Sequence, residues 1–290
     1  MRRFLAGAAG SRPGRLLAGV ARRYSENNLS DHAAAVTYWG FLALFPALIV
    51  IVALIGLVGS YPETYDSISS TLRDAAPGSA VDAINNALDD AIRSRGTAGG
   101  LLGVGLVLSL YSASSGTGAA LRAVNEIYGV AHADSFLRAH LKRLGLTVCL
   151  GVMLILAFAA MLVAGPLFSS ISDEAGIDES VRGIVSLLRW PIGLAALAAT
   201  ALLLYRVGAD RAIPIGKLLP GACFASLAWA IASAGFSIYV SHFGSYDATY
   251  GSLGAVIVLL IWMWIGNLAL LAGAALNVEL EHERAEGGGG

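Results

Sequence analysis

Residues 248–278 read ATYGSLGAVIVLLIWMWIGNLALLAGAALNV, a run of 31 residues without one Asp, Glu, Lys or Arg. About 20 apolar residues in a helix cross the hydrocarbon core of a bilayer, so this stretch is long enough to span a membrane. Five more charge-free intervals occur along the chain: residues 32–62, 96–121, 144–172, 190–205 and 218–246. The interval 190–205 has only 16 residues, but Arg189 and Arg206 at its ends can extend their charged heads to the two interfaces.

The composition agrees with a membrane protein. Apolar residues make up 56% of the chain and charged residues only 13%, against roughly 25% in an ordinary soluble domain. We therefore predict an all-α, polytopic membrane protein: a bundle of six transmembrane helices with short amphipathic interfacial helices. The expected spans cover about 33–59, 101–121, 144–168, 185–205, 218–240 and 252–277. Soluble enzymes, disulfide-stapled secreted domains and disordered chains are excluded.

Positive charges are divided unevenly between the two sides of this arrangement. If the N-terminus is inside, the inner segments hold 14 Lys and Arg residues and the outer segments hold 5. Lys and Arg near the ends of spans favour the cytoplasmic side. Both termini are therefore expected in the cytoplasm.

Three regions follow from this reading: a basic N-terminal arm (1–31), the six-helix transmembrane domain (32–278) and an acidic, Gly-rich tail (279–290). In the arm, apolar residues recur at helical spacing over 14–24 with arginines on the other side, which predicts a helix on anionic lipid headgroups. The outer loop 60–100 contains a second amphipathic stripe and predicts a short interfacial helix.

The sequence contains no recognisable catalytic, cofactor-binding or metal-binding motif. Its five histidines lie at 32, 132, 140, 242 and 282, and no two are four residues apart. Metal-dependent hydrolases usually place such ligands at helical spacing, and the phosphate loop GxxxxGK[ST] and the nucleophile elbow GxSxG are also missing. We expect no enzymatic activity and no cofactor.

Eleven small, polar, aromatic or proline positions in or beside the spans are candidates for a solute path or gate. They are Pro46, Ser112, Gly116, Thr117, Arg122, Asn125, Glu126, Tyr246, Asp247, Tyr250 and Asn267. Proline inside a span kinks its helix, and the small residues from 112 to 120 allow helices to approach closely. Polar residues inside spans either line a path or form hydrogen bonds between helices.

Two groups of candidates have competing interpretations. Arg122 and Glu126 share a helix face at the inner end of the second span, where they form either a gate or a surface ion pair. Asp247 is the only charge between the fifth and sixth spans and lies among tyrosines. It marks either an outer mouth or an aromatic belt with a tight turn.

Three separated blocks resemble the YihY/BrkB family of bacterial inner-membrane proteins. The first runs from Asp31-His-Ala-Ala-Ala-Val-Thr-Tyr-Trp to Leu44-Phe-Pro46, and the second from Leu110-Tyr-Ser-Ala-Ser to Tyr128-Gly129. The third begins at Leu219-Pro-Gly-Ala and continues from Tyr246 to Leu280. The resemblance covers roughly residues 20–282 and implies a six-span protein of the inner (plasma) membrane. Members have been linked to serum resistance as a virulence factor, proposed as transporters and once labelled ribonuclease BN.

We therefore expect a transporter or permease-like protein for an unidentified small solute or an envelope or lipid component. The alternative is a non-catalytic scaffolding protein of the envelope. A ribonuclease is a third hypothesis, for which the sequence shows no catalytic constellation. The expected partners are the lipid bilayer, the solute and another copy of the chain in a homo-oligomer, with no nucleic acid.

Overall fold

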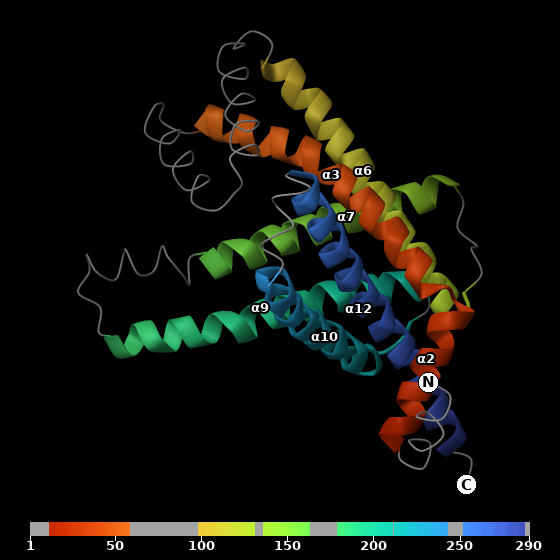
Figure 1. Cartoon of the computed structure of the whole chain (residues 1–290). Helices are drawn as coiled ribbons and strands as arrows, with labels where there is room; N and C mark the ends of the chain where they lie inside the picture. The colour runs from red at the N-terminus through yellow and green to blue at the C-terminus, as the bar shows by residue number, and fades with distance from the viewer. Residues whose placement is uncertain are drawn as a thin grey trace. The chain divides into compact units, whose positions relative to one another are not determined.

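The computed structural model describes residues 12–58, 98–130, 136–162, 179–210, 212–242 and 252–287. Within these ranges the chain is helical apart from short turns and the segment before residue 215 (Figure 1). The described helices are α2 (Arg12–Glu26), α3 (Leu29–Val58), α6 (Ala98–Ile127), α7 (Phe136–Leu162), α9 (Glu179–Gly208), α10 (Ile215–His242) and α12 (Ser252–Gly287).

The six longer helices coincide, in order, with the six predicted spans. They contain 27 to 36 residues, and at 1.5 Å per residue each is long enough to cross about 30 Å of hydrocarbon. Four segments of the described residues are also apolar enough: Gly103–Ile127, Trp190–Gly208, Ile215–Tyr239 and Val256–Glu286. The predicted helical structure is confirmed for the described residues, of which four segments are apolar enough to cross a membrane, and the number of six spans remains a prediction.

Several helices differ from the predicted spans at their ends. α12 continues as a helix to Gly287, through most of the predicted tail 279–290. α9 begins at Glu179, six residues before its expected span. Polar residues can extend a helix beyond the hydrocarbon because the backbone hydrogen bonds are made inside the helix itself. Two predictions lie outside the described residues: the outer loop helix within 60–100 and the end of the third span at 168.

The helix expected over 14–24 is present as α2. A tight turn joins it to α3, in which the Asn27 N–H donates to the Arg23 carbonyl at 2.9 Å and closes α2. Asn28 has a φ of 44°, a left-handed conformation that asparagine tolerates better than most residues. The Asp31 N–H then donates to the Asn28 carbonyl at 2.9 Å and starts α3.

The contacts within the chain define two compact units. The first contains residues 1–36, 117–239 and 262–290, and the second contains residues 37–116 and 240–261. Small side chains dominate the core of the first unit, where α7 and α9 also pack side by side. Residues with no exposed surface there include Ala33, Ala123, Ala209, Ala222, Ala274 and Ala275. Small residues let helix backbones approach closely, as is usual between membrane helices.

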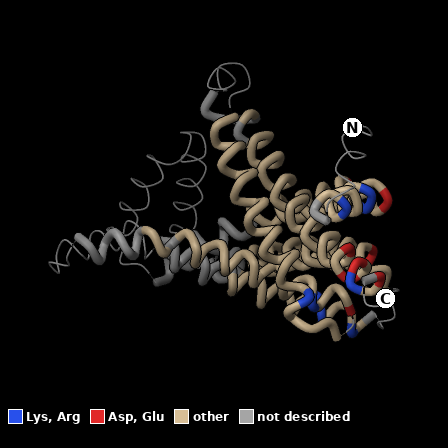
Figure 2. The backbone as a smooth tube through the Cα atoms, turned by 90° about the horizontal axis from the view of Figure 1, so that it is seen from below, with Lys and Arg blue, Asp and Glu red and all other residues tan. Residues whose placement is uncertain are grey.

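Among the residues that Figure 2 colours, Lys, Arg, Asp and Glu gather at the ends of the helices near the two chain termini. Some of them connect different segments: Lys142 of α7 forms an ion pair with Asp210 at 2.5 Å, and His32 Nε2 of α3 lies at hydrogen-bond distance, 2.9 Å, from Glu126 of α6. The ends of the helices thus carry the polar contacts, while the segments between them are apolar. This separation is expected for helices whose middle parts lie in hydrocarbon.

Gly116 marks a close approach of α3 and α6 within the second unit. A Cβ atom at Gly116 would lie 3.4 Å from Trp39 Cβ and 3.7 Å from the Gly40 nitrogen. The Trp39 ring also packs edge-on against Tyr111 of α6, with the ring centroids 6.3 Å apart. Within the small-residue run 112–120, residues 116–120 are buried and residues 112–115 are half-buried, so the predicted close packing is confirmed for its second half.

Replacing Gly116 by leucine is expected to destabilise the protein by about 2 kcal/mol, because the larger side chain would have to displace Trp39 or separate α3 from α6. Thermal melting of the purified protein in detergent measures the loss. Gly103→Leu on the same helix is the control, since a Cβ there meets no atom within 4 Å. Equal melting temperatures for the two variants would contradict the close packing at Gly116.

Candidate functional site

A cavity of about 260 Å³ lies between α9, α10 and α12, inside the first unit. Residues 263–270 of α12, 197–201 of α9 and 225–229 of α10 form its walls. The lining residues are Leu197, Thr200, Ala201, Ala225, Ser226, Trp229, Met263, Gly266, Asn267 and Leu270. All ten lie in segments that are apolar enough to cross a membrane, and none of the ten is charged. Cavities between the helices of a bundle are frequent ligand sites.

The polar groups of this cavity come from all three helices. The Thr200 hydroxyl donates to the Ala196 carbonyl at 2.9 Å, and the Ser226 hydroxyl donates to the Cys223 carbonyl at 3.0 Å. Each hydroxyl uses its hydrogen within its own helix, so its oxygen retains lone pairs that can accept a further hydrogen bond. Asn267 contributes an amide group. The cavity therefore suits an uncharged ligand that donates hydrogen bonds.

One aromatic ring, that of Trp229, lines the cavity from α10. Trp229 packs against Trp262 with ring centroids 5.8 Å apart at an angle of 61°, and the Trp262 indole N–H donates to the Ser233 hydroxyl at 3.1 Å. A Cβ atom at Gly266 would lie 3.0 Å from Trp229 Cδ1, so the glycine makes room for the indole ring. The ring is thereby held against α12 at the edge of the cavity.

A close crossing of α10 and α12 separates the cavity from the charged end of the helices. A Cβ atom at Gly221 would overlap the Gly273 carbonyl oxygen, and one at Gly273 would overlap the Gly221 carbonyl oxygen. The backbones are therefore in contact at this point. Tyr205 of α9, with no exposed surface, donates from its hydroxyl to the Leu270 carbonyl at 2.5 Å and packs beside Gly273.

Asn277 connects α12 to α10 one turn nearer the charged end. Pro220 lies inside α10 and has no N–H to donate to the Gly216 carbonyl. Asn277 Oδ1 accepts from the Gly221 N–H at 2.8 Å, and Asn277 Nδ2 donates to the Leu218 carbonyl at 2.9 Å. The side chain, only 3% exposed, therefore holds the turn that contains the proline.

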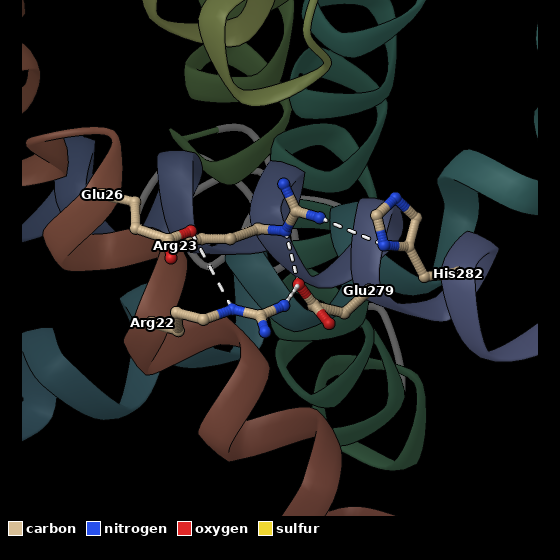
Figure 3. Close-up of polar contacts among 5 residues, drawn as sticks. All are labelled: Arg22, Arg23, Glu26, Glu279 and His282. Atoms are coloured by element: carbon tan, nitrogen blue, oxygen red, sulfur yellow. Dashed lines mark hydrogen bonds and ion pairs between the residues drawn. The ribbon is translucent and has the colours of Figure 1, made fainter.

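A second polar cluster connects α2 with the end of α12 (Figure 3). Glu279 is 8% exposed and accepts from Arg23 Nε at 2.5 Å and from an Arg22 terminal nitrogen at 3.4 Å. Arg23 also lies 3.4 Å from His282 Nδ1, and Arg22 lies 3.9 Å from Glu26. Gly19 of α2 faces the Glu279 carboxylate and leaves room for it. The cluster anchors the N-terminal helix to the last helix of the chain.

Comparison with known proteins gives the family. Residues 20–289 match the family described as virulence factor BrkB, which is nearly the whole chain.

This chain belongs to the virulence factor BrkB family.

Relatives with two different names are similar to this chain. A protein named as ribonuclease-like protein YfkH, from Bacillus subtilis, is 30% identical over 262 residues, or 90% of this chain and 93% of the relative. Proteins named UPF0761 membrane protein, from Xanthomonas campestris and Xanthomonas oryzae, are 26% identical over 88% of this chain. The chain spans 58% of the length of these Xanthomonas relatives. No solved structure matches.

In this BrkB-family protein, Asn267 is the one predicted path residue that lines the cavity. Gly116 and Thr117 are buried in helix contacts, Thr117 beside the Thr147 hydroxyl at 2.9 Å, and Ser112 is half-buried. Thr117 therefore belongs to the contact of α6 with α7.

The predicted group at the inner end of α6 forms different contacts from those expected. Glu126 pairs with His32 of α3 at 2.9 Å, and not with Arg122. The Asn125 amide, in the orientation that satisfies its neighbours, donates to the Gly208 carbonyl of α9. Two residues four positions apart on one helix can form a pair at its surface, but a side chain on another helix can come closer to one of them. Both residues therefore connect helices.

The remaining predicted positions cannot be placed in the site. Tyr246, Asp247 and Tyr250 lie outside the described residues. Pro46 falls within α3, and its side chain also lies outside the description. Across the described side chains, no three His, Cys, Asp or Glu residues come together in a way that could hold a metal ion.

Sequence reasoning missed several members of this site, namely Thr200, Ser226, Trp229, Tyr205 and Asn277. One signal was available for Asn277, because it is one of only two asparagines in the last charge-free interval. Pro220 in the preceding helix was the other signal, since a proline inside a helix needs a partner for the freed backbone groups.

Proposed function

We propose that this protein is a permease-like membrane protein that binds a small uncharged solute in the cavity between α9, α10 and α12. The observation that carries the proposal is the set of Thr200, Ser226 and Asn267 around one cavity inside apolar helices. The Thr200 and Ser226 oxygens keep lone pairs that can accept hydrogen bonds from a ligand, and Asn267 adds an amide group. The solute class that fits is a hydroxyl- or amide-bearing compound, which includes the uncharged part of an envelope or lipid precursor.

The membrane arrangement belongs to the same proposal. Six helices cross the inner membrane with both termini in the cytoplasm, where the excess of Lys and Arg favours the cytoplasmic side. α2 then lies at the cytoplasmic surface near anionic headgroups, since it is anchored to the charged end of α12. In this arrangement, the crossing at Gly221 and Gly273 lies between the cavity and the cytoplasm. Passage of a solute to that side requires the crossing to open.

Binding of the solute is tested by thermal melting of the purified protein against a panel of sugars, polyols, glycerol-based headgroups and amides. A ligand present at 100 times its Kd stabilises the folded protein by about 2.7 kcal/mol. We expect Asn267→Leu and Ser226→Ala to remove this stabilisation, because each takes away a polar group that lines the cavity. Flux of the same compound into proteoliposomes then tests transport.

The matched control is Ser237→Ala, which removes the same hydroxyl from an exposed position of α10 away from the cavity. This variant should retain the response of the wild-type protein. The proposal fails if no uncharged compound stabilises the wild type, or if Ser237→Ala loses the response as completely as Ser226→Ala.

The name of the Bacillus subtilis relative makes RNA cleavage the main competing function. We propose that this chain is not a ribonuclease, because no three His, Cys, Asp or Glu side chains come together among the described residues, and Glu126 and Asp210 are each held by a residue of another segment. The same purified protein, incubated with RNA and Mg²⁺ or Mn²⁺, distinguishes the two. If the protein has a scaffolding role and no transport activity, we expect no compound to bind in the cavity and no flux into proteoliposomes.

A further inference from the structure

Two arginines from neighbouring helices meet over Gly118. A Cβ atom at Gly118 of α6 would lie 2.6 Å from Arg143 Cδ and 2.9 Å from Arg143 Nη1, both on α7. Arg122 Nη1 would lie 3.5 Å from the same point. Because both Nη1 atoms lie within 3.5 Å of this one point, the two guanidinium groups are close neighbours. The missing side chain of Gly118 is what lets Arg143 pass close to the α6 backbone.

Among the residues that the structure describes, no carboxylate lies within ion-pair distance of Arg122 or Arg143. The nearest acidic residue along α6 is Glu126, which pairs with His32 at 2.9 Å. On the α7 side, Asp210 pairs with Lys142 at 2.5 Å. Arg143 Nε is buried and has no hydrogen-bond partner in the described part of the chain. A buried N–H without a partner is costly, and two nearby positive charges repel each other.

An anion with several oxygens would accept a hydrogen bond from the unpartnered arginine N–H and would offset the repulsion between the two positive charges. Guanidinium groups match the geometry of phosphate, since two parallel N–H groups can donate to two oxygens of the same group. The terminal nitrogens remain reachable, because Arg122 is exposed and Arg143 is half-buried. One turn farther along the helices, the Thr147 hydroxyl lies 2.9 Å from the Thr117 hydroxyl, and both residues are buried. The site is therefore open to the surface and closed toward the interior.

The position of the pair along α6 agrees with phosphate chemistry. Arg122 lies near the end of the apolar segment Gly103–Ile127, one turn before Glu126, which contacts His32 of α3. Phospholipid headgroups lie at this level of a bilayer, and basic pockets between membrane helices bind them. Free inorganic phosphate has the same recognition chemistry.

We propose that Arg122 and Arg143, brought together over Gly118, form a phosphate-binding site at the end of the contact between α6 and α7. The site is separate from the cavity between α9, α10 and α12, and it does not depend on the proposed transport activity. Its ligand is a phosphate group, carried by an anionic phospholipid or free in solution.

The test is thermal melting of the full-length protein in detergent, with each ligand source added separately. Dioleoyl phosphatidylglycerol is compared with dioleoylglycerol, which has the same chains without phosphate. Sodium phosphate is compared with sodium chloride at equal ionic strength, because salt alone screens the charges. We expect at least one phosphate-bearing additive to raise the melting temperature, and the additive that does so identifies the source. No rise with either additive overturns the proposal.

Variants then connect the response to the two arginines. Arg143→Gln and Arg122→Gln should each weaken the apparent affinity roughly tenfold or more, because each removes one charged donor. Gly118→Ala keeps every charge but displaces the Arg143 side chain, so it should weaken the affinity as well. Arg138→Gln is the matched control, an exposed arginine on the same helix as Arg143. If this control loses as much affinity as Arg143→Gln, the effect is one of general charge and the proposal is overturned.

A measurement without any phosphate distinguishes a binding site from a structural arginine. If Arg143 serves to bind an anion, Arg143→Gln relieves repulsion from Arg122 and should leave the melting temperature equal or higher. A structural arginine would give a lower melting temperature in this condition and no phosphate-dependent difference from the wild type. That combination would also overturn the proposal.

Discussion

Gly221→Ala is expected to destabilise the protein by about 3 kcal/mol, although only one methyl group is added. The new Cβ would overlap the Gly273 carbonyl oxygen and lie 2.5 Å from Cγ and Nδ2 of Asn277. A backbone oxygen cannot move aside alone, so α10 and α12 must separate and lose contacts on both sides of the crossing. Thermal melting of the purified protein in detergent measures the effect.

Gly235→Ala provides the comparison, since it makes the same substitution on the same helix. A Cβ at Gly235 meets no atom within 4 Å, and alanine favours a helix over glycine by up to about 1 kcal/mol. We therefore expect this variant to melt at the wild-type temperature or slightly above it. Similar losses in the two variants would show that the crossing at Gly221 does not exist in the folded protein.

Asn277→Leu is expected to lower the free energy of unfolding by about 2 kcal/mol, which is the second large effect. Leucine keeps the size of the side chain but leaves the buried Gly221 N–H without its 2.8 Å acceptor and the Leu218 carbonyl without its 2.9 Å donor. Each unsatisfied buried group costs about 1–3 kcal/mol in soluble proteins, and measured hydrogen bonds between membrane helices are often weaker. Thermal melting again provides the measurement.

A double-mutant cycle with Pro220→Ala tests the physical reason. Alanine restores an N–H at position 220 and lets α10 adopt regular helical hydrogen bonds, so the turn depends less on Asn277. The loss caused by Asn277→Leu should then be smaller by at least about 0.5 kcal/mol in the Pro220→Ala background, a coupling typical of residues that share a contact. Additive effects would mean that Asn277 acts independently of the proline.

Much of the fold could be predicted from the charge-free intervals, and the helices α3, α6, α7, α9, α10 and α12 lie where they were expected. The helix ends were predicted less well. α12 continues through the acidic residues after Val278, and the first of them, Glu279, is paired with Arg22 and Arg23 of α2. A local rule that ends a span at its first charge has no information about a partner on another helix.

The candidate site was predicted only in part. Asn267 was recognised because it is a polar residue in a long apolar run, but Thr200 and Ser226 were not distinguished from other hydroxyls of the spans. In a soluble helix, the apolar stripe shows which face is buried. A membrane helix is apolar on every side, because lipid and protein interior are equally apolar, so the sequence does not show which face meets another helix.

The sequence by itself therefore determined which segments are helices in a membrane. Backbone groups in hydrocarbon must be satisfied within each helix, and charged residues must stay near its ends, and both requirements are local. Only the tertiary structure decided which side chains meet. It paired Glu126 with His32, placed Asn277 across from Pro220, and brought Arg122 and Arg143 together over Gly118. These contacts depend on the rotation of each helix about its axis, which a uniformly apolar sequence leaves open.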